Sequence, residues 1–302
     1  MDNLPKNLKI LEREIVPPGI DQFLIPIIYF LFIYLVHKLV DSIQKILDSG
    51  KWSYFKILSD EFLASFSVTS LILIKYDWDM YFGSKQGLTT AVGCFLQCLF
   101  LAEISSGVGD PVLYYFSEMV KSNGFVKFDK QLYNIFAVQI AGSIIGGIFI
   151  SWIWSFEISK MHWMHTYNYF DVPSSSLTVG IGYGVFLEST GFFLIYLAEK
   201  VLKYEKISEK VNSKIKNVLM SLAITGAVML CVNETGAPLS PALALGMNLY
   251  IWQKDAVAHL LVFWICPAIL MHWLAKFETV GKKKLVSKDR QKMIKKIKEK
   301  LD

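Results

Sequence analysis

Apolar residues in this chain come in unbroken runs of about twenty, rather than in the one-sided stripes of helices that pack onto a soluble core. A run of that length crosses the hydrocarbon layer of a membrane as a helix. The runs predict seven spanning helices, at residues 22–41, 57–75, 86–106, 132–154, 177–199, 216–232 and 255–277. The predicted fold class is therefore an all-α membrane protein.

Two further stretches are too short and too broken to span a membrane. They are GVGDPVLYYFSEMV at 107–120 and NETGAPLSPALALGMNLY at 233–250. Each contains glycine, then a capping residue followed by proline, and then a short apolar helix, which is the pattern of an N-cap and first turn. We expect half-helices at 110–120 and 240–250. Irregular backbone at membrane depth is tolerated only where protein buries it or where it lines a wet cavity, so the pattern predicts a pore or a binding site.

The order of these elements repeats along the chain. Span, span, half-helix and span occur in residues 57–154 and again in residues 177–278. Because three spans is an odd number, the two copies enter the membrane from opposite sides, and their half-helices meet head to head near the midplane. The run at 22–41 is an extra helix before the first copy. Residues 1–21 and 279–302 are expected to be tails.

Charge adds an orientation to this architecture. The 302 residues carry a formal net charge of +5, and lysines gather at 45–56, 121–130, 200–216 and in the C-terminal tail. By the positive-inside rule these segments are cytoplasmic, which leaves the N-terminus lumenal or extracellular. A basic tail beside a membrane faces anionic lipid rather than nucleic acid. Lys298 and Lys300 have the spacing of a dilysine retrieval signal, which favours the endoplasmic reticulum or another intracellular membrane over the plasma membrane.

Enzymatic chemistry finds little support in the sequence. The four cysteines all lie inside apolar runs, where a cysteine usually behaves as a small hydrophobe. Cys94 and Cys98 share a helix face, but no histidine or carboxylate lies near them to complete a metal site. We expect no catalytic residue, no metal and no cofactor.

Several strings resemble the aquaporin family. They are EFLASF at 61–66, AVQIAGSIIGG at 137–147, ETGAPLSPALALG at 234–246 and HLLVFWICPAIL at 259–270. The resemblance covers residues 57–278 and is greatest to the divergent superaquaporins, which also carry an apolar segment before the first repeat. It implies an aquaporin-like inverted repeat, a passive channel with one pore per subunit and a homotetramer in the lipid bilayer.

The two pore motifs depart from the family pattern. The family has two Asn-Pro-Ala motifs, whereas this chain has Asp110-Pro111-Val112 and Ser240-Pro241-Ala242. In the family each Asn offers an amide N–H to the passing oxygen and so interrupts proton relay. Ser240 can donate through its hydroxyl, but an ionised Asp110 has no donor and weakens the barrier to cations. The simpler interpretation is that Asp110 acts only as an N-cap.

The resemblance also places a selectivity filter and two supporting glutamates. The filter positions are Thr90, Val228, Ala237 and Leu243, the last in place of the family's arginine. Small, uncharged filter residues favour glycerol or hydrogen peroxide beside water. Glu61 and Glu188 are implied to accept hydrogen bonds from the re-entrant loops, and a proton-relay pair is the alternative.

Two other functions are compatible with these residues. One is a proton-coupled secondary transporter that uses Asp110 at the interface between repeats. The other is a non-conducting scaffold that keeps the aquaporin fold but plugs its own pore. Aromatic side chains at Tyr114, Tyr115 and Phe116 would be the candidates for such a plug.

Overall fold

The computed structural model describes residues 20–47, 53–82, 86–122, 128–156, 176–204, 211–248 and 256–280, with 126, 162, 165, 166 and 209. The spanning helices are α2 (Ile20–Leu47), α3 (Ser53–Phe82), α4 (Gln86–Ile104), α6 (Lys130–Trp154), α8 (Ile181–Lys203), α10 (Ser213–Thr235) and a terminal span, Ala256–Val280. These 7 helices are long and apolar enough to cross a membrane. The described residues form helices and no strand, which confirms the all-α prediction.

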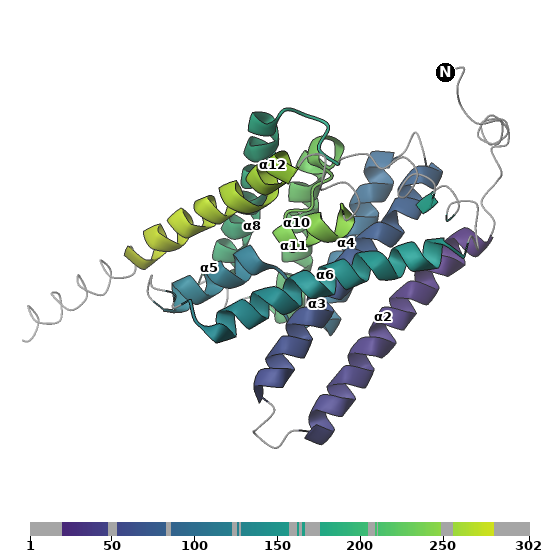
Figure 1. Ribbon diagram of the computed structural model, residues 1–302, viewed down its shortest axis with the longest axis horizontal. Helices are drawn as coiled ribbons and strands as arrows, with labels where there is room; N and C mark the ends of the chain where they lie inside the picture. The colour runs from purple at the N-terminus through teal and green to yellow at the C-terminus, as the bar shows by residue number, and fades with distance from the viewer. Residues whose placement is uncertain are drawn as a thin grey trace, which may run out of the picture.

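Two short helices lie between the spans where half-helices were expected (Figure 1). They are α5 (Pro111–Lys121) and α11 (Pro241–Met247). The second has Asn248 as its C-cap, and both the backbone N–H and the side-chain amide of this residue donate to the Ala244 carbonyl. Residues 249 and 250 lie outside the described part.

Each half-helix packs against spans of the opposite repeat. Val112, Phe116 and Met119 of α5 share a cluster with Phe192 of α8 and Met271 of the terminal span. The α11 helix is held in the same way by the first repeat. Leu243 and Met247 pack with Leu73 of α3 and with Ile150 and Trp154 of α6. The two repeats are therefore interlocked, and neither half-helix depends on its own repeat alone.

Small residues allow the helices around α11 to approach closely. A Cβ added at Gly246 would lie 2.6 Å from the Ser143 carbonyl oxygen, and one added at Gly146 would lie 2.8 Å from that of Phe66. Beside them the hydroxyls of Thr69 and Ser143 are 2.5 Å apart. Close backbone contact of this kind is typical of helix packing in membranes, where van der Waals contact and interhelical hydrogen bonds hold helices together.

The extra helix α2 packs along the first repeat, as Figure 1 shows. His37 Nε2 lies 2.9 Å from the Ser67 hydroxyl of α3, and the Gln44 amide donates to Asp60 at 2.9 Å. Further along, the rings of Phe30 and Phe100 meet edge to face at 4.9 Å. The polar contacts fix both the rotation and the register of α2 on α3.

The terminal span contains a widened turn. Residues Leu260–Ile265 form a π-helical turn directly before Pro267. Proline lacks an N–H and its ring clashes with the carbonyl four residues earlier, here that of Phe263. A wider turn moves that carbonyl away, so the proline is accommodated without ending the helix.

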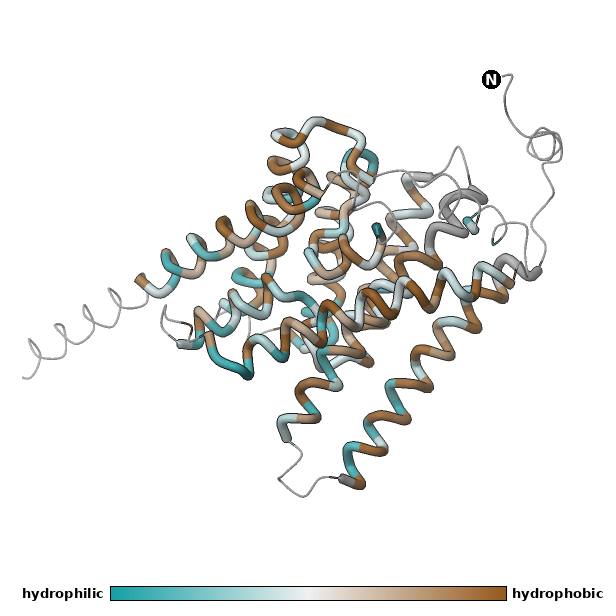
Figure 2. The backbone as a smooth tube through the Cα atoms, in the orientation of Figure 1, coloured by the Kyte–Doolittle hydropathy of each residue, from teal (hydrophilic) through white to brown (hydrophobic). Residues whose placement is uncertain are grey.

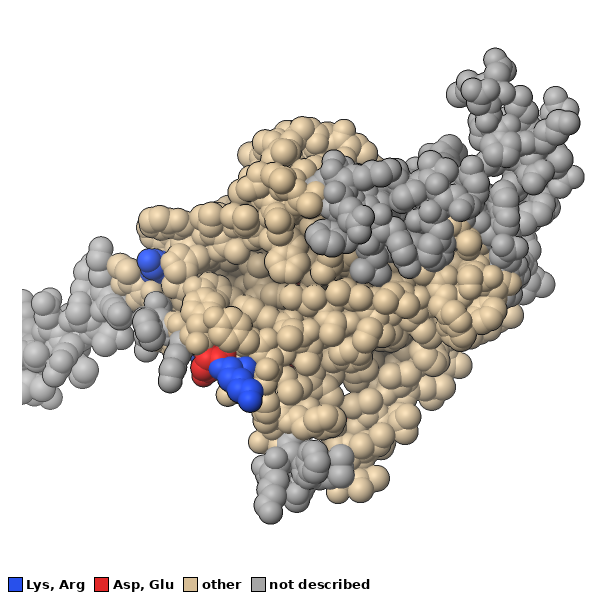
Figure 3. All heavy atoms as spheres, in the orientation of Figure 1, with Lys and Arg blue, Asp and Glu red and all other residues tan. Residues whose placement is uncertain are grey.

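The outer surface of the helices suits a hydrocarbon environment. Apolar positions recur along all the helices (Figure 2), and many large apolar side chains are exposed, including Leu35, Val92, Ile148 and Phe186. The face in Figure 3 carries almost no charged side chains over its described area. Such a surface is costly in water and stable in lipid.

Candidate permeation site at the heads of the half-helices

Asp110 forms the head of α5. Its backbone is extended (φ −136°), and Oδ1 accepts the Leu113 N–H at 2.6 Å, so the residue is an N-cap with Pro111 in the first turn. The side chain is buried at 4% exposure. Its second oxygen, Oδ2, is buried without a hydrogen-bond partner among the described residues. Since a buried carboxylate oxygen is strongly destabilised when unpaired, this atom would be stabilised by any hydrogen-bond donor that reaches it.

Ser240 forms the head of α11 in the same way. Its backbone is extended (φ −166°), and its hydroxyl oxygen accepts the Leu243 N–H at 3.2 Å. The helices α5 and α11 are in contact, and the Ser240 hydroxyl approaches the Asp110 carboxylate. The two caps, which come from different repeats, therefore face each other where the half-helices meet.

Glu61 of α3 supports the first re-entrant loop. Its carboxylate accepts the Val108 N–H (3.0 Å) and the Gly109 N–H (2.8 Å), together with the side-chain amide of Gln139 on α6 (2.8 Å). The Ser65 hydroxyl donates to the Gly109 carbonyl at 2.8 Å. Gly109 has a φ of +69°, a conformation that glycine adopts without steric cost. The backbone groups that this turn exposes are thus satisfied by α3.

Glu188 of α8 supports the second loop. The side chain is fully buried, accepts the Leu239 N–H at 3.1 Å and also accepts the Thr235 hydroxyl. That hydroxyl oxygen in turn accepts the Ala237 N–H at 3.1 Å. The loop contains three left-handed residues, Gly236 (φ +76°), Ala237 (+48°) and Leu239 (+44°). Two of these are not glycine, so this turn is more strained than the first.

Gln139 and Thr235 complete the two supports, and reasoning from the sequence did not single them out. Both lie in the strings that carry the aquaporin resemblance, AVQIAG and ETGAPLS. The spacing of these strings does not say which polar residue faces a glutamate. A useful signal would have been a buried polar residue on an otherwise apolar span, which Gln139 (0% exposed) is.

The three apolar residues among the four proposed filter positions pack in two hydrophobic clusters. Val228 and Ala237 lie together in a cluster formed by α8, α10 and the second loop. Leu243 is 4% exposed and packs elsewhere, against Leu73 and Ile150 of the first repeat. Thr90 is buried on α4. Leu243 is therefore engaged in helix packing, whichever residues line the pathway.

Two of the three aromatic residues on α5 are held by other helices. Phe116 is 5% exposed and meets the Tyr196 ring of α8 edge to face at 5.4 Å. The Tyr115 hydroxyl lies 2.9 Å from His272 Nδ1 of the terminal span. Tyr114 is half-buried. Phe116 and Tyr115 thus join α5 to the second repeat.

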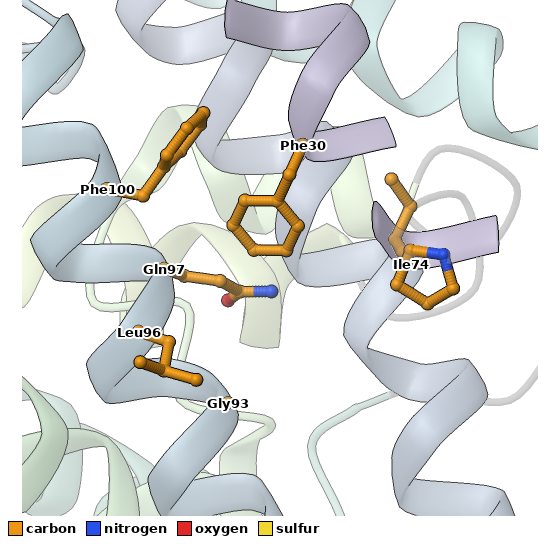
Figure 4. Close-up of a pocket in the computed structure, with 7 residues that line it drawn as sticks. Phe30, Ile74, Gly93, Leu96, Gln97 and Phe100 are labelled. Carbon is orange, nitrogen blue, oxygen red and sulfur yellow. The ribbon is translucent and has the colours of Figure 1, made fainter. Parts of the chain in front are cut away.

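A separate apolar pocket of about 310 Å³ lies away from the half-helix heads. It is formed where α2 crosses α3 and α4, and Figure 4 shows Phe30 and Phe100 beside the Gln97 side chain, with Leu96 and Ile74 around them. Gln97 is the polar member of this lining, and its amide donates to the Leu71 carbonyl at 2.6 Å. This pocket therefore lies between the extra helix α2 and the first repeat, and the residues that line it do not include the caps of α5 and α11.

Among solved structures, the chain is similar to the aquaglyceroporin from Plasmodium falciparum. The match has 18% sequence identity and a TM-score of 0.55, and it covers 78% of this chain and 99% of that one. No family model matches the sequence, and no curated protein matches it. At this identity the similarity shows the fold, which is an aquaporin-like inverted repeat with an added N-terminal helix, as the sequence predicted.

Proposed function

We propose that the chain is a passive transmembrane channel for water and small neutral solutes such as glycerol and hydrogen peroxide. The aquaporin-like fold and the seven membrane-length helices support a channel in general. The observation that carries the proposal is the meeting of two capped half-helices at Asp110 and Ser240, where Asp110 Oδ2 is buried without a geometrically defined hydrogen bond to a described residue although the Ser240 hydroxyl is near the carboxylate. A permeating molecule that donates a hydrogen bond would satisfy it.

Permeation by this route needs no catalytic group. A solute that leaves water loses hydrogen bonds, and it regains them from groups fixed along the path. Here the groups are the Asp110 carboxylate and the Ser240 hydroxyl. Both are held in place by their own helices through the Leu113 and Leu243 N–H groups, so little reorganisation is needed when a solute arrives.

The selectivity of the channel is proposed from Thr90, Val228 and Ala237, with Leu243 in place of an arginine. None of these residues is charged, and a path lined by them would exclude polyols less strongly than a path that contains an arginine and a bulky aromatic residue. Because the Leu243 side chain packs against helices of the first repeat, its main effect on selectivity would be that the path has no fixed positive charge at this position.

The proposed assembly is a homotetramer of the superaquaporin type in the endoplasmic reticulum or another intracellular membrane, with the C-terminus in the cytoplasm. The lysine distribution supports this orientation. The retrieval signal at Lys298 and Lys300 lies outside the described residues and stays a prediction from the sequence.

A proton-coupled transporter is the second candidate function. The unpaired Oδ2 of Asp110 favours it, because a carboxylate at the interface between inverted repeats is a common coupling group in transporters. Coupled transport would require solute uptake to saturate and to follow a pH gradient, whereas a channel requires neither.

Osmotic flux measurements test the proposed function. Purified protein in proteoliposomes is mixed rapidly with sucrose, glycerol or hydrogen peroxide gradients, and the volume or peroxide content is followed over a range of temperatures. We expect fast flux with a low activation energy. Flux no faster than in protein-free vesicles, from protein shown to be folded, would refute the channel.

A further inference from the structure

The midpoint between α5 and α11 offers one unpaired acceptor and one donor. Asp110 Oδ1 is occupied by the Leu113 N–H, while Oδ2 is buried and unpaired among the described residues. The Ser240 oxygen accepts the Leu243 N–H, which leaves its O–H available to donate to the nearby carboxylate or to a molecule between the two caps. The unpaired groups therefore differ in kind, although the two caps occupy equivalent positions in the repeats.

This difference decides how a water molecule is oriented. Between two donors, a water oxygen accepts twice and both of its hydrogens point outward, so it cannot take part in a continuous proton wire. Between Ser240 and Asp110, a water would accept from the hydroxyl and donate to Oδ2. One lone pair and one hydrogen would remain for the waters on either side. The hydrogen-bonded chain is then not interrupted at the midpoint.

The local charge acts in the same direction. The N-terminus of α5 carries about half a positive elementary charge, which by itself would repel a cation. An ionised Asp110 side chain at that position more than cancels it. The other nearby carboxylate, Glu61, is occupied by two loop N–H groups and by the Gln139 amide, so it does not face the midpoint as a free acceptor.

We propose that the midpoint conducts protons alongside the neutral solutes of the proposed channel, on which this inference rests. A hydronium or water on one side transfers a proton to Asp110 Oδ2, so that an O–H bond forms on the carboxylate as one breaks on the donor. The carboxylic acid then releases that proton to a water on the other side. Nothing is oxidised or reduced, and the proton gradient alone drives the transfer.

The test compares proton and water permeability in the same vesicles. Proteoliposomes contain a pH-sensitive dye, and potassium with valinomycin holds the membrane potential at zero during an external acid step. Osmotic shrinkage of the same preparation gives the water permeability. The ratio of the two is independent of how much protein is incorporated, so variants can be compared directly.

The Asp110→Asn variant removes the relay oxygen and restores a donor. A positioned proton-transfer group contributes about 10²–10⁴-fold, so we expect the proton-to-water ratio to fall at least about tenfold. Asp129→Asn is the matched control. Asp129 also caps a helix, α6, and accepts the Leu132 N–H at 3.0 Å, but it is exposed, whereas Asp110 is buried. This control should leave the ratio unchanged.

A second variant keeps the test decisive if Asp110→Asn fails to fold. In Ser240→Asn an amide donor would occupy Oδ2, and the ratio should again fall. Fast water flux in the parent protein with proton flux equal to that of protein-free vesicles would overturn this inference and leave the channel intact. Proton flux that requires an added solute would overturn it in favour of coupled transport. The absence of both fluxes in folded protein would refute the channel and the inference together.

Discussion

Replacing Glu188 by alanine should destabilise the second re-entrant loop more than any single surface change. The loop holds Ala237 and Leu239 in the left-handed region, which costs about 1–2 kcal/mol for each non-glycine residue. The buried carboxylate offsets part of this cost, since it accepts the Leu239 N–H and the Thr235 hydroxyl, which in turn accepts the Ala237 N–H.

The magnitude follows from the groups that the substitution leaves unpaired. A buried N–H without a partner costs about 1–3 kcal/mol, and the Leu239 N–H would be such a group. The Thr235 hydroxyl loses a second bond, for which the average inside membranes is about 0.6 kcal/mol. With the cavity that the missing side chain leaves, we expect the free energy of unfolding to fall by about 2–4 kcal/mol. Transport should fall further, because this loop positions Ser240.

Unfolding by sodium dodecyl sulfate in mixed micelles, followed by circular dichroism, measures this loss. Glu199→Ala is the control on the same helix, because Glu199 forms an exposed ion pair with Lys203, and such pairs contribute about 0–1 kcal/mol. Glu188→Gln keeps an acceptor for the Leu239 N–H and should lie between the two. If Glu188→Ala were as stable as Glu199→Ala, the carboxylate would not be what holds the loop.

Three further changes probe the packing around the site. Gly246→Ala should lower the free energy of unfolding by about 1–3 kcal/mol, because its Cβ would lie 2.6 Å from a carbonyl oxygen of α6. Its control is Gly87→Ala, whose Cβ would meet nothing within 4 Å and which should leave the free energy of unfolding unchanged in the same assay. His37→Ala and Ser67→Ala should show a coupling energy of about 0.6 kcal/mol in a double-mutant cycle, and additive effects would mean that their 2.9 Å contact does not anchor α2. Leu243→Arg should sharply reduce the yield of folded protein, since it buries an unpaired charge in an apolar cluster. A stable variant with slower glycerol flux would instead place position 243 in the permeation path.

The spans and the half-helix caps could be predicted from the sequence because they depend on local information. Run length alone identifies a spanning helix, and the Asp110-Pro111 and Ser240-Pro241 pairs are cap signals within two residues. The C-terminal bound of the second half-helix stays a prediction beyond Asn248, the C-cap of α11, because residues 249 and 250 lie outside the described part.

Contacts between distant elements could not be predicted in the same way. Most of the α2 run is apolar around the helix, so its hydrophobic pattern alone does not say which face meets α3. The polar residues His37 and Gln44 were the available signals, because polar groups in a span usually face protein. Likewise, the filter position of Leu243 stays a prediction from the alignment, and its packing against α3 and α6 could not be foreseen because it depends on how the two repeats interlock.

A thiol introduced at the head of α11 tests whether solutes pass between the two half-helices. In Ser240→Cys proteoliposomes, water flux is measured before and after a small thiol reagent and again after a reductant, with the parent protein and its own four cysteines treated identically. If the path runs between Asp110 and Ser240, flux in the variant falls on labelling and recovers on reduction, while the parent is unaffected. Complete labelling of the introduced thiol with unchanged flux would show that solutes do not pass between the half-helices.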